Sequence, residues 1–80
     1  IMVKIIGSVQ AFHSNENPED FFRCDGSILL INEHPILFSS IGTTFGGDGE
    51  TTFQIPNNLD QEIPDVEYWI CYNGDSPRNA

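Results

Sequence analysis

The residues that could do chemistry are densest in GTTFGGDGETTFQIP, residues 42–56, which combines four glycines with two Thr-Thr pairs, Asp48 and Glu50. A glycine-rich loop can cradle a phosphate, and carboxylates with hydroxyls can hold a metal ion. A phosphate loop also needs a lysine directly after its last glycine, and no lysine follows Lys4. A calcium loop needs more carboxylates at alternate positions. The stretch therefore predicts a glycine turn rather than a ligand site.

The cysteines and histidines do not form a pattern typical of a metal or nucleophilic site. Cys24 and Cys71 lie in apolar segments, and His13 and His34 stand at no ligand spacing from them or from each other. No spacing pairs a base with a nucleophile either. We therefore expect buried, unpaired thiols in a reducing compartment. We expect no cofactor, no metal and no catalysis.

The chain is strongly acidic: it has 12 aspartates and glutamates but only 3 lysines and arginines, which gives a net charge of −9. Such a charge argues against direct binding of nucleic-acid phosphates or anionic membranes and favours basic partners. No apolar run approaches the ~20 residues of a membrane span. We expect Met2 to be the natural start, Ile1 to be a cloning remnant, and no signal peptide to direct secretion.

The local patterns predict short strands around one helix. Residues 2–12 indicate a strand with a bulge or close approach at Gly7, and 13–20 a polar loop. Apolar segments on both sides of Asp25-Gly26 predict a two-residue hairpin. Residues 32–42 predict a helix, capped by Asn32 and ended by Gly42, with Ile36, Leu37 and Ile41 near one face and Phe38 flanking it.

The second half of the chain predicts two further strands. Residues 51–56 place Phe53 and Ile55 on one side of a brief strand, and 57–65 form a polar link. Residues 66–73 form a closing strand, followed by a tail at 74–80. The expected architecture is a single small α+β domain over residues 1–80, with mostly antiparallel strands packed around the helix.

The segment RCDGSILLINEHPILFSSIGTTFGGDGETTFQIPN resembles the phage tail collar domain family, whose members carry a CDG cysteine, a helix with Leu-Phe and a stretch of the form GTTYGGDGxTTFxLPD. The ending YWICYNGDSPRNA resembles the family's closing segment. The resemblance places a collar core at residues 2–56. Its turn residues are Cys24, Asp25, Gly26, Gly46, Gly47, Asp48 and Gly49. We expect at least one of the last three glycines to adopt a positive φ. We expect both aspartates to hydrogen bond the local backbone.

The resemblance implies a structural module of a phage tail fibre, collar or baseplate, acting in virion assembly or host attachment, without catalysis. It also implies a homo-oligomer, with a trimer as the leading expectation, in contact with other virion proteins. The family's long insertion after the proline is absent here, which indicates a minimal, free-standing member. The alternative is a small acidic phage-encoded protein that inhibits or sequesters a basic host protein. The expected location is the virion or the cytoplasm of the infected cell.

Aromatic residues that are adjacent on a strand point to opposite faces, so some must leave the core side of their sheet. Either a loop covers these residues or they form a contact surface. The candidate interface residues are Phe21, Phe22, Arg23, Tyr68 and Trp69.

Overall fold

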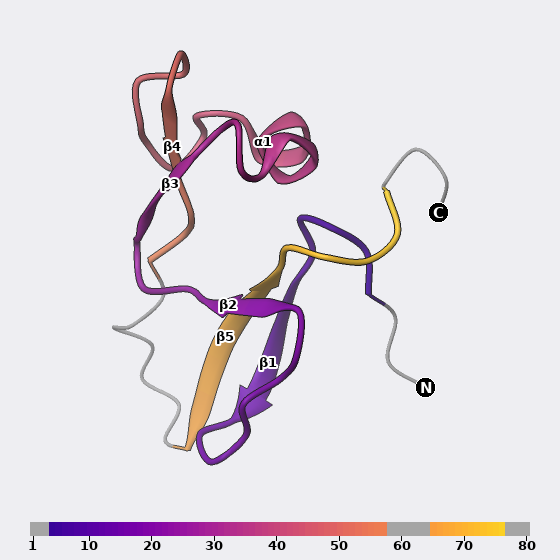
Figure 1. Ribbon diagram of the computed structural model, residues 1–80. Helices are drawn as coiled ribbons and strands as arrows, with labels where there is room; N and C mark the ends of the chain where they lie inside the picture. Colours follow the sequence, from indigo (N-terminus) through magenta and orange to yellow (C-terminus); the bar gives the residue numbers. More distant parts are fainter. Residues whose placement is uncertain (1–3, 58–64, 77–80) are drawn as a thin grey trace.

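The computed structural model describes residues 4–57 and 65–76. These residues form two antiparallel sheets and one short helix, an α+β arrangement (Figure 1). The elements in chain order are β1 (Val9–His13), β2 (Phe21–Arg23), β3 (Ile28–Leu30), α1 (Pro35–Ile41), β4 (Thr52–Gln54) and β5 (Val66–Cys71). The predicted fold class is confirmed at this level. The division into a core, a closing strand and a tail stays a prediction.

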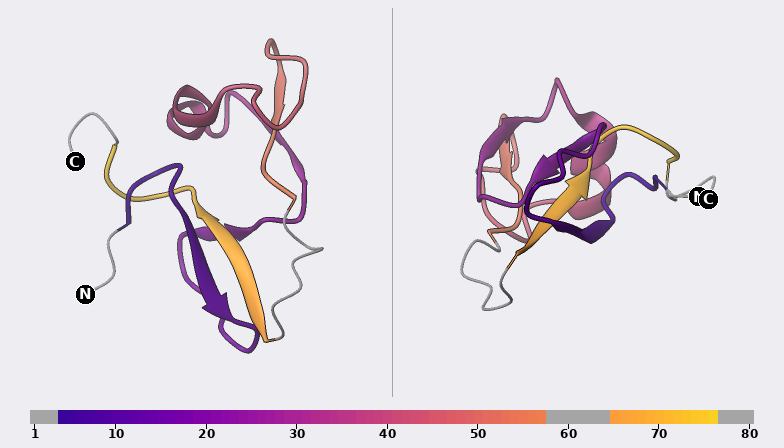
Figure 2. Two further views of the ribbon diagram at one scale, coloured as in Figure 1. Left: turned by 180° about the vertical axis from the view of Figure 1, so that it is seen from behind. Right: turned by 90° about the horizontal axis from the view of Figure 1, so that it is seen from below.

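The closing strand β5 is the centre of the larger sheet, whose order is β1-β5-β2. Trp69 on β5 pairs with Gln10 on β1 and with Arg23 on β2. Figure 2 shows β1 and β5 side by side from behind, although they come from opposite ends of the chain. The larger sheet therefore needs residues from both ends of the described chain.

The predicted hairpin at Asp25-Gly26 is wrong, because β2 and β3 belong to different sheets. β2 pairs with β5, whereas β3 pairs with β4 through Leu29 opposite Phe53. The turn redirects the chain from one sheet to the other. Pairing with distant strands buries Phe53 and Ile70 completely. The hydrophobic free energy gained by this burial outweighs the local preference for a hairpin turn.

The helix begins later than predicted. His34 is its N-cap without a side-chain hydrogen bond, so Asn32 does not cap it. Pro35 explains the start, since proline suits the first helical turn and disfavours helical geometry in the residue before it. Gly42 ends the helix with a φ of 57°, as predicted, and its N–H bonds Phe38 O at 2.7 Å.

The inner face of the helix differs from the prediction at one residue. Leu37 is 1% exposed, but Ile36 is 48% exposed, so the expectation that Ile36 faces the core is wrong. Consecutive helical positions are rotated by about 100° around the axis. The stripe that contacts the core runs through Leu37, Phe38 and Ile41 instead.

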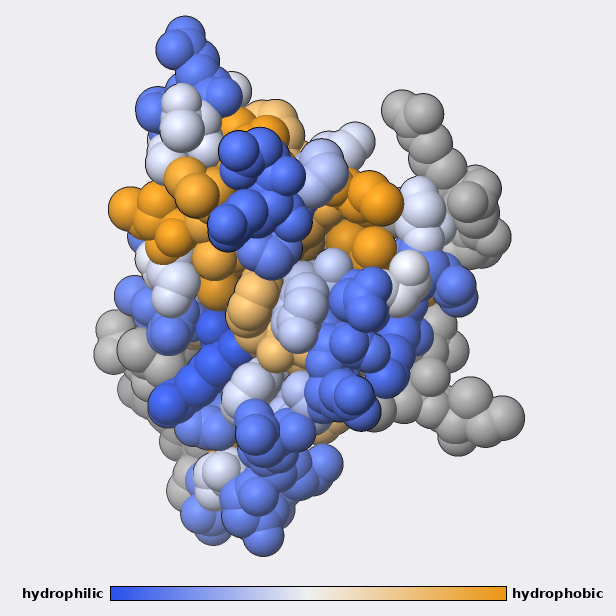
Figure 3. All heavy atoms as spheres, viewed as in Figure 1, coloured by the Kyte–Doolittle hydropathy of each residue, from blue (hydrophilic) through white to orange (hydrophobic). Residues whose placement is uncertain are grey.

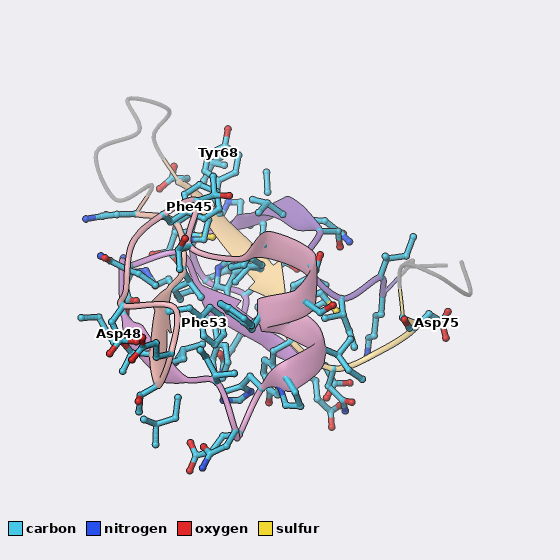
Figure 4. The ribbon with its side chains drawn as sticks, turned by 90° about the horizontal axis from the view of Figure 1, so that it is seen from above. Phe45, Asp48, Phe53, Tyr68 and Asp75 are labelled. Atoms are coloured by element: carbon cyan, nitrogen blue, oxygen red, sulfur yellow. The ribbon has the colours of Figure 1, made fainter. Side chains whose placement is uncertain are left out.

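The core lies between the helix and the two sheets. Figure 4 shows Phe53 beside α1, and its ring lies 5.5 Å from that of Phe38 in an edge-to-face arrangement. Phe53 and Ile55 are both buried, which agrees with the prediction that they lie on the same side of the strand. The buried cluster consists of Ile6, Cys24, Leu37, Phe53, Ile55 and Ile70.

The N-terminal strand is shorter than predicted. β1 begins at Val9, and Gly7 lies in a turn with a φ of 94°. The close approach at Gly7 is confirmed, because a Cβ there would meet the Ser40 side chain. Before it, Ile5 forms an isolated bridge with Asp75, so part of the predicted tail is tied to the start of the described chain. Most of the predicted polar link, residues 58–64, lies outside the described residues.

Candidate functional site

The glycine loop is organised by one carboxylate. Asp48 Oδ1 accepts the backbone N–H groups of Glu50, Thr51 and Thr52 at 2.9, 2.8 and 2.9 Å. These bonds, led by that from Thr52, lower the pKa of Asp48 to about 2, because they stabilise the charged form. One oxygen of this exposed carboxylate therefore hydrogen bonds the backbone of its own loop and holds the loop closed (Figure 4).

The glycines of this loop adopt backbone conformations that other residues rarely take. Gly46, Gly47 and Gly49 have φ values of 129°, 95° and 76°, so the prediction of positive φ is confirmed. A Cβ at Gly47 would lie 2.8 Å from Thr52 O and would also meet the backbone of Phe53. The loop is thus packed against its own strand rather than shaped around a ligand.

The second turn of the motif is held in the same way. Asp25 Oδ1 accepts the backbone N–H of Ser27 at 3.0 Å and also the Ser27 hydroxyl. Gly26 has a φ of 79° and donates its N–H to Pro56 O at 3.1 Å. The predicted local hydrogen bonding of both aspartates is confirmed.

Gln54 joins the two turns, and the sequence interpretation missed it. Its backbone N–H bonds Gly46 O at 3.1 Å, and its Nε2 bonds Gly26 O at 2.8 Å. One side chain on β4 therefore ties the glycine loop to the turn after Cys24. In the sequence, only its position between Phe53 and Ile55 on a strand of alternating pattern indicated that its side chain lies on the opposite face from theirs.

Both cysteines are buried and unpaired, as predicted. Burial raises the pKa of Cys24 to about 11, and the nearby Asp25 charge adds to this rise. Burial also raises the pKa of Cys71. Neutral, buried thiols are poor nucleophiles and poor metal ligands. Among residues 4–57 and 65–76, no three histidine, cysteine, aspartate or glutamate side chains gather as a metal site.

The five candidate interface residues divide between the two faces of the larger sheet. Phe22 and Tyr68 pack against the core cluster. Phe21, Arg23 and Trp69 point to the opposite face, as their pairing register requires. Whether any of the five contacts another molecule stays a prediction.

Several side chains on the outer face of the larger sheet contact one another. Phe21 is only 5% exposed and lies edge-on to Phe12 at 5.3 Å. Arg23 forms an ion pair with Glu67 at 2.7 Å. The Nε1 atom of Trp69 is buried, and no acceptor within the described part of the chain bonds it. A buried donor without a partner costs about 1–3 kcal/mol.

An aromatic cluster that includes His34 was also missed. Phe22 stacks on Tyr72 with ring centroids 4.1 Å apart, and His34 lies edge-on to Phe22 at 5.3 Å. The cluster joins β2, the residue before α1 and the residue after β5. No spacing along the chain could have revealed it.

Comparison with known protein families identifies a match over most of the chain. The sequence model of the phage tail collar domain matches residues 7–63 of the 80-residue chain. No curated protein and no solved structure matches this chain. Within the described ranges, no helix is long and apolar enough to cross a membrane.

Proposed function

Because the chain belongs to the phage tail collar domain family, we propose that it is a non-enzymatic structural module of a phage tail fibre, collar or baseplate. Its role is in virion assembly or host attachment, and its place is the virion. The observation that carries this proposal is the family match over residues 7–63, which includes both aspartate-glycine turns.

The use of the motif residues supports a structural role. Asp48 and Asp25 each bond the backbone within a few residues, and Cys24 is 1% exposed with a raised pKa. These groups are the ones that an enzyme would need to keep available for substrate. Here they are spent on turn geometry and packing.

We also propose that the module assembles with copies of itself, with a trimer as the leading arrangement, and with other virion proteins. The partly exposed aromatic residues Tyr68 and Trp69 on the larger sheet support this, because such residues are enriched at the centres of interfaces. Chains of this length also gain from association, since a single small core contributes only a few kcal/mol.

Mass spectrometry of purified phage particles tests the proposal. We expect peptides of this chain in gradient-purified virions, in a constant ratio to a known tail protein. The same gradient fraction from cells infected with a phage that cannot assemble tails is the control. Detection only in the soluble fraction of infected cells would contradict a virion role.

A further inference from the structure

The two outermost segments of the described chain, residues 4–6 and 74–76, lie side by side and run in the same direction (Figure 1). Ile5 and Asp75 form a parallel bridge between them. Two backbone hydrogen bonds of 2.7 and 2.9 Å hold the bridge, and Asp75 takes part in both. These two paired segments form the terminal clasp.

Hydrogen bonds rather than apolar packing hold the second segment of the clasp. Ile6 anchors the first segment in the core, whereas residues 74–76 include no buried residue. Figure 3 shows mainly hydrophilic residues on the right of the molecule, where the clasp lies. The two backbones approach closely at Gly74, because a Cβ there would collide with the backbone of Lys4.

Asp20, which directly precedes β2, fastens the clasp from outside. Its Oδ2 accepts a hydrogen bond from Lys4 Nζ at 3.1 Å, and its Oδ1 accepts one from Asn73 Nδ2 at 3.1 Å. Its carbonyl oxygen accepts the backbone N–H of Tyr72 at 2.9 Å. Asp20 has a φ of 70°, which residues other than glycine rarely adopt. One residue therefore ties the chain next to both segments to the start of β2.

The direction of pairing decides how the clasp responds to tension. In a parallel pair, a pull toward the N-terminus of one segment opposes a pull toward the C-terminus of the other. Tension between residues 4 and 76 would therefore slide the two segments past each other and load both bridge bonds at once. The contacts of Asp20 oppose the same movement.

The ladder between β1 and β5 lies behind the clasp and is antiparallel, with Val9 opposite Ile70. The start of β1 and the end of β5 are thus at the same end of this ladder. Tension that reached this end directly would open the ladder one hydrogen bond at a time. The clasp stands between the pull and this weaker geometry.

We propose that the terminal clasp is a mechanical clamp, which lets the domain carry tension through its two outermost segments without opening the β1–β5 ladder. Asp20 is the residue that fastens the clamp. This load-bearing function goes beyond the structural role proposed above and does not depend on a virion location.

Single-molecule force measurements on the full chain, held by handles at its two ends, test the clamp. The survival time of the folded state at constant force is measured, because forced unfolding is governed by the unfolding rate. Lys4→Met removes the ion pair with Asp20, and Arg23→Met removes a similarly exposed ion pair outside the clasp. We expect Lys4→Met to shorten the survival time by about twofold to fivefold, and Arg23→Met to change it much less.

Gly74→Ala tests the backbone contacts of the clasp. The added Cβ would force the two segments apart and break both bridge hydrogen bonds. We expect the survival time under end-to-end tension to fall by about tenfold or more.

A second pulling direction distinguishes load bearing from a general loss of stability. Handles are attached to Ser14→Cys, after β1, and to Ser39→Cys, on α1, because both positions are exposed. The natural cysteines are buried and leave the handles to the new ones. Tension between these positions bypasses the clasp, so Gly74→Ala should affect the survival time much less than it does under end-to-end tension.

The proposal is overturned by any of three results. The first is equal shortening of the survival time by Lys4→Met and Arg23→Met under end-to-end tension. The second is no effect of Gly74→Ala in that direction, which would show that the β1–β5 ladder bears the load. The third is equal shortening by Gly74→Ala in both directions, which would limit the clasp to a contribution to stability.

Discussion

At the scale of single residues, Asp48 links the acid stability of the domain to the geometry of one loop. Its pKa is lowered from 3.8 to about 2 by backbone bonds in the folded state. A lowered pKa contributes stability above the unfolded value, and that contribution is lost as the pH falls through the folded value. The relevant window therefore lies between about pH 4 and about pH 2.

We expect Asp48→Asn to melt a few degrees below the parent at neutral pH, since the amide oxygen still accepts N–H bonds but lacks the charge. The difference should shrink as the pH falls through this window, because the parent carboxylate then becomes neutral as well. Thermal melts of both proteins across the acid range measure it. A difference that stays constant down to pH 2 would show that the charge of Asp48 does not matter.

Alanine substitutions at Gly42 and Gly47 distinguish the cost of backbone strain at positive φ from the cost of a steric clash of the added Cβ. A Cβ at Gly42 meets nothing within 4 Å, whereas at Gly47 it meets the backbone of Thr52 and Phe53. We expect Gly42→Ala to cost about 1–3 kcal/mol through its backbone conformation alone, and Gly47→Ala to cost clearly more. Urea unfolding curves give both values. Equal costs would mean that the loop can move away from β4 freely.

At the scale of elements, the structure assigns β5 to the centre of the larger sheet and removes Ile36 from the core. The pair Ile70→Ala and Ile36→Ala tests both assignments with the same chemical change. Ile70 is 0% exposed, and Ile36 is 48% exposed. We expect Ile70→Ala to lower the free energy of unfolding by about 2–5 kcal/mol and Ile36→Ala by less than about 1 kcal/mol.

Denaturant unfolding at a single temperature measures both variants against the parent. Similar losses for the two would contradict the burial seen here. A large loss of unfolding free energy for Ile36→Ala alone would show that Ile36 packs in the core, on the helix face that the sequence predicted.

At the scale of the whole molecule, charge opposes the self-association proposed above. The net charge of −9 makes copies repel one another, and salt screens this repulsion over about 8 Å at physiological ionic strength. We therefore expect the assembly to strengthen from low to physiological salt, toward three times the chain mass of 8.9 kDa. Size exclusion with light scattering measures the mass. A value of 8.9 kDa at every salt and protein concentration would rule the assembly out.

Trp69→Phe provides the matched variant for this measurement. It keeps a ring on the outer face but presents a smaller aromatic surface to a neighbouring copy. We expect weaker association with little change in monomer stability. Unchanged association would place the interface elsewhere.

The sequence by itself determined the local geometry of this protein. The aspartate-glycine turns, the positive φ of Gly47 and the helix end at Gly42 follow from preferences that act over a few residues. Helix and strand segments were located for the same reason, apart from their ends. The motif at residues 42–56 was recognised as a turn because its glycines lacked the partners that a ligand loop needs.

Only the tertiary structure decided which segments pair and which faces are buried. The Asp25-Gly26 turn favours a hairpin locally, yet β2 pairs with β5 and β3 with β4. Strand partners are chosen by the burial of residues such as Phe53 and Ile70 against segments far along the chain, and no local pattern encodes that choice. The buried cluster between the helix and the sheets and the link through Gln54 exist only because of those pairings.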